Sequence, residues 1–372
     1  MAKGSEKENK RSGVLICGAY GMCNAGDEAI LEAVVSEMRS IDPDMPITVL
    51  SRTPQATAEK HGVDSLHMFD LFGFLRVMKS CRLYINGGGS LIQDVTSSRS
   101  LWYYLYTLAA AKRRGCRVLM YGCGIGPVRR GLNRALTAYV INRYVDAITL
   151  REENSLAELQ AFGVTKPETV VASDPAMTLS GAAPELVDTK MRELGLDPEG
   201  KYICFCLRYW PGFAERAKCF AAAADYAYEN YGLTPLLVSV NLRSDGQAGE
   251  DAAKFMKAPH VVLSEPMPTE LTVGIIARVH ALVSIRLHGL IFAASQAVPI
   301  AGVSYDPKVS SFLDYIGQRN YVPLEDLTEE SLKDLIDGAL RADRAVLAAA
   351  AERLKSMESR NTQAARRLLG KD

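Results

Sequence analysis

A chain of 372 residues is too long for one ordinary hydrophobic core, so its length predicts about two domains. Hydrophobic residues make up 48% of the chain and charged residues 23%, which are values typical of a globular protein. The 43 basic and 43 acidic side chains cancel, which excludes a global field that would attract nucleic acid or an anionic membrane. Any basic site must therefore be local.

Cysteine usage and the polarity of the first residues indicate the compartment. Eight cysteines occur without a CxxC pair, and several of them, such as Cys17, Cys204 and Cys206, lie inside apolar runs. We interpret them as buried thiols in a reducing cytosol rather than as disulfides or metal ligands. Residues 1–11 are polar and lack the apolar core of a secretory signal. No run approaches the roughly 18 apolar residues that span a bilayer, so we expect a cytoplasmic protein.

The first predicted elements are a strand, a glycine-rich turn and a helix. Apolar residues 14–17 lead into a turn over 18–28, and apolar positions then recur at helical spacing from Ala29. The turn has neither GxGxxG spacing nor a Walker lysine, which disfavours a dinucleotide-dependent oxidoreductase. It allows close backbone approach to a ligand, with Asn24 and Asp27 presented at the helix start. Asp27 also fits a plain first-turn acid that favours the helix dipole.

A second glycine-rich turn follows the strand predicted near residues 83–86. Three glycines at 87–89 make room for backbone contact with a ligand and for a nest of N–H donors, and Ser90 follows them. Asp94 lies one turn into the next helix, where it could face the same crevice. The aromatic run 102–106 fits helix packing better than a sugar-binding platform. Strands up to about residue 180 each end in a small or polar group, which predicts one doubly wound domain over 13–180.

The second half repeats the pattern after a polar link at 181–200 that contains proline and glycine. Its first strand, near 202–207, ends before Arg208, and alternating strands and helices continue to about residue 340. The remainder, 341–372, is rich in Ala, Leu and Arg and is predicted to be a C-terminal helix. The predicted fold is α/β, with two Rossmann-like doubly wound domains facing a cleft and a C-terminal helical segment.

The stretch 276–309 carries the strongest chemical signal in the chain. A strand over 281–285 ends in Arg286-Leu287-His288-Gly289, and a further strand over 300–304 is followed by Lys308. Ligands of open α/β sheets bind outside the carboxyl ends of the strands. Two cations and an imidazole at that edge suit a small, multiply anionic ligand. The alternative is a helix N-terminus with ordinary surface charges.

Seven short motifs, taken together, resemble the polysaccharide pyruvyl transferase family over about residues 13–315. The nearest relatives by this resemblance are the CsaB-type enzymes of Gram-positive cell walls. The motifs are Gly18-x-Tyr-Gly-x-x-Asn24-Ala-Gly-Asp27-Glu-Ala-Ile-Leu, Gly87-Gly-Gly-Ser-Leu-x-Gln-Asp94, Gly124-Ile-Gly-Pro127, Leu150-Arg151, Asp174-Pro-Ala, Arg286-Leu-His288 and Ser304-Tyr-Asp-Pro-Lys308.

The resemblance implies a GT-B-like fold and a pyruvyl transferase with phosphoenolpyruvate as donor substrate and no further cofactor. It implies as acceptor an N-acetylmannosamine of a lipid-diphosphate-linked secondary cell-wall polymer precursor. The product would be a 4,6-ketal that serves S-layer anchoring in cell wall biogenesis, with release of phosphate. Such an acceptor would bring the protein to the inner face of the cell membrane. The basic runs at 112–114 and 129–130 support membrane contact only weakly, since such runs are usually solvated faces.

The resemblance also implies roles for individual residues. His288 is the expected general acid and phosphate partner, because the pKa of an unperturbed imidazole lies near working pH. Asp94 and Asp27 are the candidate bases, with Asp174 a weaker third. No metal is expected, because the chain has no His/Asp cluster at ligand spacing. The expected substrate-binding residues are Arg286, Lys308, Arg208, Arg151, Leu287, Gly88, Gly89, Ser90 and Asn24.

Two other functions remain compatible with the residues. A GT-B nucleotide-sugar glycosyltransferase of cell-envelope polysaccharide synthesis would need an acidic residue to hold the ribose, and Asp306 lies after a late strand. A non-catalytic sugar-binding module is disfavoured because Arg286, His288 and Lys308 are all present. Nucleic acid is not an expected partner.

Overall fold

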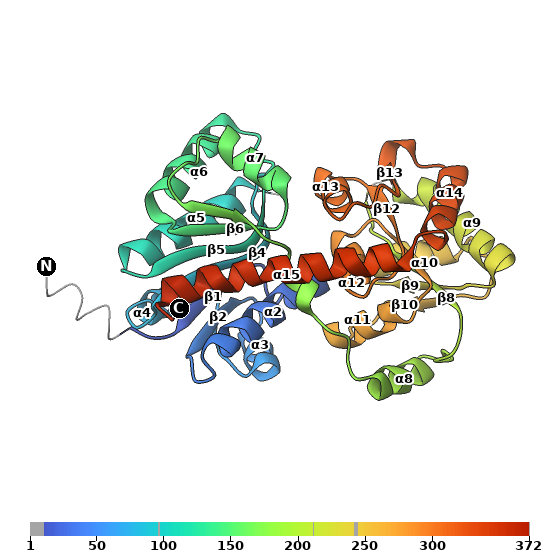
Figure 1. Ribbon diagram of the computed structural model, residues 1–372, viewed down its shortest axis with the longest axis horizontal. Helices are drawn as coiled ribbons and strands as arrows, with labels where there is room; N and C mark the ends of the chain where they lie inside the picture. The colour runs from blue at the N-terminus through green and yellow to red at the C-terminus, as the bar shows by residue number, and fades with distance from the viewer. Residues whose placement is uncertain (1–10, 96, 211, 242–244, 372) are drawn as a thin grey trace, which may run out of the picture. The chain divides into compact units, whose positions relative to one another are not determined.

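Short apolar runs form the strands of two separate sheets in the computed structural model, which describes residues 11–371 except 96, 211 and 242–244. The chain divides into two compact units, which we describe separately (Figure 1). Unit 1 contains residues 1–22, 27–175 and 356–372, and unit 2 contains residues 23–26 and 176–355.

The sheet of unit 1 has seven parallel strands in the order β3-β2-β1-β4-β5-β6-β7. The strands are β1 (Val14–Cys17), β2 (Ile47–Ser51), β3 (Asp64–His67), β4 (Leu83–Ile92), β5 (Arg117–Ile125), β6 (Ala147–Leu150) and β7 (Glu168–Val171). The helices that alternate with them are α2 (Ala25–Ile41), α3 (Pro54–His61), α4 (Leu71–Val77), α5 (Ser98–Arg113), α6 (Gly131–Tyr144) and α7 (Glu153–Ala161). A 3₁₀ turn, η1 (Pro175–Thr178), follows β7.

The two faces of this sheet are covered by different helices. Helices α4, α5, α6 and α7 share one core with strand residues such as Leu15, Cys17 and Tyr84. Helices α2 and α3 lie on the opposite face of the sheet (Figure 1). Because β1 and β4 are covered on both faces, all their residues except Ser90 are buried, as expected for central parallel strands.

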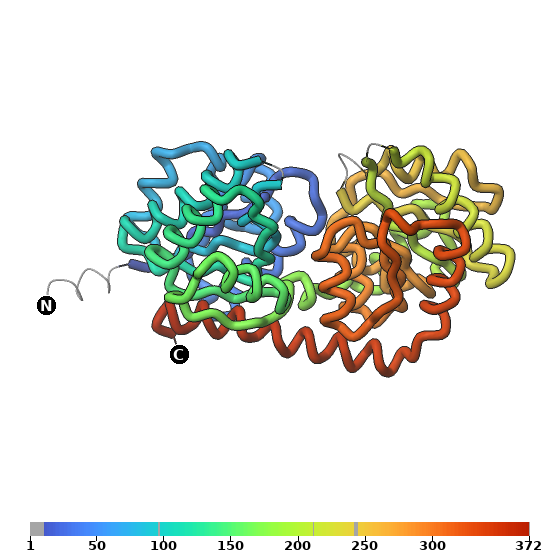
Figure 2. Tube along the Cα trace, turned by 90° about the horizontal axis from the view of Figure 1, so that it is seen from above, coloured from blue at the N-terminus to red at the C-terminus, as the bar shows by residue number. Residues whose placement is uncertain are grey.

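The sheet of unit 2 has six parallel strands in the order β10-β9-β8-β11-β12-β13. The strands are β8 (Tyr202–Cys206), β9 (Thr234–Val238), β10 (Val261–Leu263), β11 (Ala281–Ser284), β12 (Ile300–Ser304) and β13 (Tyr321–Pro323). The helices are α8 (Pro184–Glu193), α9 (Phe213–Tyr231), α10 (Gly246–Ala253), α11 (Thr269–Ala277), α12 (Leu287–Ser295), α13 (Pro307–Tyr315), the 3₁₀ turn η2 (Leu324–Asp326) and α14 (Glu329–Leu340). The alternation of strand and helix can be followed along the trace in Figure 2.

The last helix, α15 (Arg344–Leu369), contributes to both units. Its residues up to 355 belong to unit 2, where Arg353 donates a hydrogen bond to the Tyr315 carbonyl (2.8 Å). Residues 356–372 belong to unit 1, where Asn361 Nδ2 donates to the Ser173 carbonyl (3.0 Å). The observed division therefore differs from the predicted domains 13–180, 181–340 and 341–372. Residues 23–26 join unit 2, and the C-terminal helix is shared rather than separate.

The cysteines and helices bear on two further expectations. All eight cysteines have free thiols, and six of them are buried, while Cys23 is exposed and Cys219 is half-buried. The interpretation of the strand cysteines as buried thiols is confirmed. Among the described helices, none combines the length and the apolar content that a membrane span requires.

Candidate functional site

The switch point of the unit 2 sheet lies between β8 and β11, from which the chain proceeds to opposite edges. Ligands of doubly wound sheets bind outside the carboxyl ends of the strands at such a point. Arg208 follows β8, Arg286 follows β11, and Lys308 follows β12, the next strand in the sheet. Three predicted substrate-binding cations therefore come from adjacent strand ends.

Arg286 is held in one orientation by Asp245. The Nε of Arg286 donates to Asp245 Oδ2 (2.8 Å), and its Nη2 pairs with Oδ1 of the same carboxylate. The Asp245 side chain is only 1% exposed and also accepts the backbone N–H of Asn241 (2.8 Å). A bidentate pair fixes the plane of the guanidinium as well as its position. Asp245 lies 41 residues before Arg286 and was not among the predicted site residues.

The ring of Tyr305 contacts the other two cations, Arg208 and Lys308. The Arg208 guanidinium stacks on the Tyr305 ring at 4.2 Å from its centroid, and Lys308 Nζ lies 5.4 Å from the same centroid. Asp306 caps α13 by accepting the backbone N–H of Lys308 (3.1 Å), and its carboxylate lies 3.4 Å from Lys308 Nζ. Asp306 therefore acts as a helix cap and as a counter-charge for Lys308 in this arrangement.

His288 lies in the first turn of α12 and packs against the backbone of Gly26. A Cβ added at Gly26 would lie 2.0 Å from His288 Nδ1, so only glycine allows the imidazole to occupy this position. Asn24 continues the same segment: it forms a bridge with Asn241, and its Oδ1 accepts the N–H of Gly26 (3.3 Å). Leu287, predicted to bind substrate, is only 5% exposed.

In unit 1 the corresponding switch point lies between β1 and β4. Gly88 and Gly89 both adopt left-handed backbone conformations, with φ of +64° and +68°. A Cβ at Gly88 would lie 2.2 Å from Ile30 Cγ2, and one at Gly89 would lie 3.4 Å from Asp27 Oδ1. Asp27 therefore lies beside Gly89, and both glycines belong to strand β4 where the sequence predicted a turn.

The first glycine turn of unit 1 is held by Tyr20 and Glu28. Tyr20 is buried, and its hydroxyl donates to the Gly87 carbonyl (2.8 Å). Glu28 Oε1 accepts the backbone N–H of Gly21 (2.7 Å). A Cβ at Gly87 would lie 2.5 Å from the Tyr20 hydroxyl, so that glycine makes room for a protein side chain. Glu28 and Gly87 thus have structural roles that the motif alone did not reveal.

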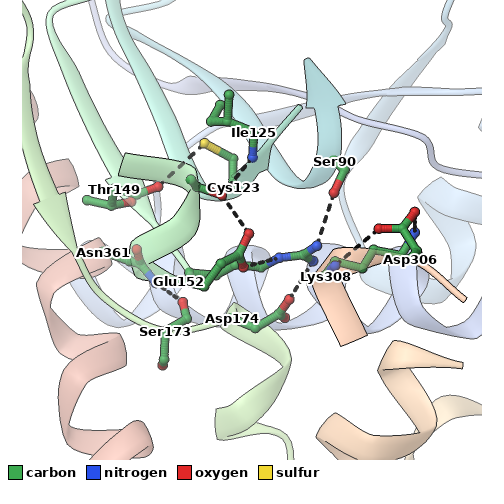
Figure 3. A network of polar contacts seen from close by, with 12 residues as sticks. Ser90, Cys123, Ile125, Thr149, Glu152, Ser173, Asp174, Asp306, Lys308 and Asn361 are labelled. Carbon is green, nitrogen blue, oxygen red and sulfur yellow. Dashed lines mark hydrogen bonds and ion pairs between the residues drawn. The ribbon is translucent and has the colours of Figure 1, made fainter. Parts of the chain in front are cut away.

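Ser90, Glu152 and Asp174, labelled in Figure 3, belong to a polar network in unit 1 in which all three bond to Arg151. Its side chain is 4% exposed and pairs with Glu152 (Nε to Oε2, 2.8 Å) and Asp174 (Nη1 to Oδ2, 3.0 Å). Burial lowers the pKa of the guanidinium, but the two carboxylates raise it more, so the charge is retained. Nη2 donates to Ser90 Oγ (3.1 Å). This geometry favours a positioning role for Arg151 over direct substrate binding.

Asp94 is engaged on both carboxylate oxygens. It accepts the backbone N–H of Arg129 (2.7 Å) and of Arg130 (3.0 Å), and the side-chain amide of Asn133 (2.9 Å). Burial raises the pKa of Asp94, but these hydrogen bonds lower it more, and the net shift is downward. Asp94 thereby orders the turn that starts α6. Its predicted role as the base stays a prediction, and its contacts favour a structural role.

Within each unit the structure brings together part of the predicted site. Unit 2 places Arg208, Arg286 and Lys308 on adjacent strand ends, and unit 1 places Asp27 beside Gly89. Sequence reasoning missed Asp245 and Tyr305, which orient these cations. Asp245 lies seven residues beyond β9, at the start of α10, and that strand-end position was the available signal.

Comparisons with known proteins agree with these motifs. The family model of the polysaccharide pyruvyl transferases matches residues 24–307, which is most of the chain. The amylovoran biosynthesis protein AmsJ of Erwinia amylovora is 20% identical over 391 aligned positions, covering 88% of this chain and 90% of that protein.

Solved structures with similar folds have little sequence in common with this chain. The UDP-GlcNAc 2-epimerase of Methanocaldococcus jannaschii aligns with a TM-score of 0.63 at 11% identity, covering 89% of this chain and 93% of that chain. Anabaena Alr3699/HepE, solved with UDP and glucose, aligns with a TM-score of 0.64 at 10% identity, covering 97% and 100%. These likenesses show the fold, which is the GT-B type that the sequence predicted. The motifs and the family model show that the chain belongs to the polysaccharide pyruvyl transferase family, and it is therefore a transferase.

Proposed function

We propose that the chain transfers the pyruvyl group of phosphoenolpyruvate to a sugar of a cell-envelope polysaccharide precursor, forming a 4,6-ketal and releasing phosphate. Membership of the family supports pyruvyl transfer onto a polysaccharide. The observation that carries the choice of donor is the set of cations at the ends of β8, β11 and β12. A donor with a phosphate and a carboxylate needs several cationic partners, which this set supplies.

The three cations are not equivalent as ligands for oxyanions. Asp245 fixes the Arg286 guanidinium, which suits a directional contact with one oxyanion. Arg208 stacks on Tyr305, and no carboxylate of the described residues lies within ion-pair distance of it, so its charge is the least compensated. We assign Arg286 and Lys308 to the phosphate and Arg208 to the carboxylate of the donor. Developing charge on the leaving phosphate is stabilised by the first two.

The proposed reaction needs one acid and one base. A sugar hydroxyl adds to C2 of the enol while His288 gives a proton to C3, which becomes a methyl group. The C2–O bond to phosphate then breaks, and the second hydroxyl adds at C2 to close the ketal. Of the two hydroxyl protons, one restores His288 and the other leaves through a base to phosphate or solvent. We assign the base to Asp27, because Asp94 is engaged on both oxygens.

The proposed acceptor is the N-acetylmannosamine of a lipid-diphosphate-linked wall-polymer precursor, used at the cytoplasmic face of the membrane. This choice rests on the resemblance to the CsaB-type enzymes. The structural neighbours include proteins solved with UDP, so a nucleotide-sugar donor is the alternative that an experiment must separate.

The test measures phosphate release from phosphoenolpyruvate with and without a synthetic N-acetylmannosaminyl-β-1,4-N-acetylglucosamine diphospholipid. We expect acceptor-dependent release that His288→Ala abolishes. His260→Ala is the matched control, since His260 contacts the Ala258 carbonyl and has no proposed role. Binding of phosphoenolpyruvate without release would keep the donor and exclude this acceptor. Binding of UDP-sugars but not phosphoenolpyruvate, measured by thermal shift, would overturn the proposal.

A further inference from the structure

One part of unit 1 is strongly basic although the chain as a whole is neutral. Between Asp94 and Asp146 the sequence contains no Asp or Glu, and it contains nine Lys or Arg residues. They are Arg99, Lys112, Arg113, Arg114, Arg117, Arg129, Arg130, Arg134 and Arg143. This stretch includes all of α5 and α6. The charge asymmetry within a neutral chain indicates a local surface for an anionic partner.

The same region exposes large hydrophobic side chains. Of the fifteen such side chains that are exposed among the described residues, nine lie between residues 69 and 139. The most exposed are Leu132 (87%) and Phe72 (86%). The others are Phe69, Leu71, Val95, Trp102, Tyr106, Leu136 and Tyr139. Single exposed apolar residues need no explanation, but a concentration on one region marks an interaction surface.

These residues lie on one face of the unit 1 sheet, because α4, α5 and α6 share the core on that face. A cavity of about 180 Å³ joins the segment before α4 to α5, and its lining includes Phe69, Leu71 and Tyr106. Helix α5 is in turn linked to α6, because the indole N–H of Trp102 on α5 donates to Asn133 Oδ1 on α6 (2.9 Å). We call the exposed apolar and basic residues of α4, α5 and α6, with Phe69 and Arg52, the basic aromatic face.

Cations and apolar side chains are exposed together on α5 and α6. On α6, Leu132, Leu136, Tyr139 and Arg143 are all exposed and recur at spacings of four, three and four residues, which places them on one side of the helix. On α5, Arg99 precedes exposed Trp102 by three residues. The Arg52 guanidinium lies 5.5 Å from the Phe69 ring centroid. Apolar groups and cations are therefore presented together rather than in separate patches.

We propose that the basic aromatic face docks on an anionic lipid bilayer. The free energy falls when exposed Phe and Leu side chains enter the boundary between head groups and acyl chains, and Trp and Tyr favour the interface itself. Arginines at the same level meet the negative surface potential of the lipid. Single-stranded nucleic acid also binds basic aromatic surfaces through base stacking. The aliphatic Leu71, Leu132 and Leu136 offer no stacking plane, which favours the bilayer.

The first experiment is flotation of the full-length protein with vesicles. Phosphatidylcholine vesicles with about one-third phosphatidylglycerol should bind the protein at least tenfold more strongly than pure phosphatidylcholine, and added salt should weaken the binding. No binding to anionic vesicles would overturn the proposal. So would equal binding to both vesicle types, which would remove the role of the arginines. Displacement of the protein from vesicles by single-stranded RNA at lower concentration than lipid would assign the surface to nucleic acid instead.

Variants with matched controls locate the surface. Phe72→Asp should reduce vesicle binding about tenfold or more, while Leu186→Asp on α8 of unit 2, at 61% exposure, should not. Arg99→Gln with Arg143→Gln should weaken binding about fivefold for each charge removed. Arg192→Gln with Arg319→Gln removes two exposed cations of unit 2 and should leave it unchanged. Equal losses in a variant and its control would contradict the assignment. Far-ultraviolet circular dichroism checks that each variant is folded.

Tryptophan fluorescence gives a readout that does not depend on activity. The chain has two tryptophans, and Trp210→Phe leaves only Trp102, which is 50% exposed on α5. On anionic vesicles the Trp102 emission should shift to shorter wavelength and be quenched by lipids brominated near the head group. An unchanged spectrum with bound protein would place the contact elsewhere. The proposal is independent of pyruvyl transfer, so failure of either leaves the other standing.

Discussion

The two units share a strand order but present different chemistry at their switch points. In both sheets the first strand lies beside the second and the fourth, as in β2-β1-β4 and β9-β8-β11. In unit 1 the strand ends carry glycines and Asp27, whereas in unit 2 they carry Arg208, Arg286 and Lys308. The backbone therefore determines where a site can form, and the two or three residues after each strand determine its charge.

Two buried carboxylates, one in each unit, are accommodated in different ways. In unit 2, Asp245 is neutralised by Arg286. In unit 1, Glu358 on α15 is 2% exposed, and it accepts hydrogen bonds from two neutral groups, the Tyr121 hydroxyl (3.0 Å) and Asn361 Nδ2 (3.3 Å). Burial first, and then the nearby Glu37 carboxylate, raise the pKa of Glu358 to about 7. A carboxylate paired with a cation holds that cation in place, whereas the protonation of a carboxylate among neutral donors changes with pH.

The largest effect is expected at the Arg286–Asp245 pair. Arg286→Ala should lower kcat/KM for phosphoenolpyruvate by about 10²–10³, because one directional donor to the phosphate is lost. Arg286→Lys should recover little, since an ammonium cannot replace the bidentate guanidinium. Steady-state kinetics of phosphate release measure both. Arg278→Ala is the control, because Arg278 pairs with Asp188 in the same unit.

A double variant separates stability from function at this pair. Arg286→Ala leaves the Asp245 carboxylate buried without its guanidinium, whereas Arg286→Ala with Asp245→Ala removes both charges. The double variant should recover part of the lost melting temperature and none of the activity. Recovery of activity would show that Arg286 acts only by neutralising Asp245.

The next effect compares two carboxylates of unit 1. Asp27→Asn should lower kcat by about 10², as expected for loss of a general base, with little change in melting temperature. Asp94→Asn should leave kcat within a few-fold and destabilise unit 1 by about 1–3 kcal/mol, because an amide cannot accept all three hydrogen bonds. The reverse pattern, with kcat lost in Asp94→Asn alone, would make Asp94 the base.

A smaller effect, which depends on pH, is expected at Glu358. The pKa of this carboxyl in the folded chain, about 7, is raised above its ordinary value of 4.5, so the folded state holds the proton more tightly. The associated stability is present below pH 4.5 and is lost as pH rises through 7. Relative to the unaltered chain, Glu358→Gln should gain about 2 kcal/mol between pH 5 and pH 8, measured by denaturant unfolding. A difference that does not change with pH would contradict the shift.

The smallest difference is expected between two glycine variants of unit 1. The backbone at Gly88 is left-handed, so alanine there would be held in an unfavourable conformation, and its Cβ would lie 2.2 Å from Ile30 Cγ2. The control is Gly163→Ala in the same unit, because Gly163 has a φ of +81° but no atom lies within 4 Å of an added Cβ. The control should lose about 1–2 kcal/mol from backbone conformation alone. Gly88→Ala should lose about 1–2 kcal/mol more from crowding, seen as a lower melting temperature. Equal losses would mean that Ile30 moves aside without cost.

Local sequence pattern was sufficient to predict the strands that precede Arg208, Arg286 and Lys308. The strand predicted before Arg286, over 281–285, is β11 (Ala281–Ser284), because an apolar run buried on both faces has few alternatives. The helix that follows, α12, begins at Leu287, so the Arg286-Leu287-His288 motif lies at a helix start. Because β8, β11 and β12 are adjacent and parallel, the three cations that follow them lie at one edge of the unit 2 sheet.

Contacts between distant residues could not be predicted in the same way. Nothing in the spacing of Asp245 and Arg286 marks them as partners, and the pair depends on β9 and β11 ending at the same edge. Asp94 shows the same limit: its predicted role as the base came from its position after the glycines, and spacing could not show that a loop 35 residues later supplies N–H donors to it. The membership of residues 23–26 in unit 2 is likewise a tertiary property.

The division of α15 between the units has a consequence for synthesis on the ribosome. Residues 356–372, which complete unit 1, emerge only after the whole of unit 2 has been made. Until then the buried Tyr121 hydroxyl lacks Glu358 and Thr362, its partners at 3.0 and 3.2 Å. A nascent chain that ends near residue 175 therefore holds an incomplete unit 1, so we expect the folding of the earliest-made sheet to finish last.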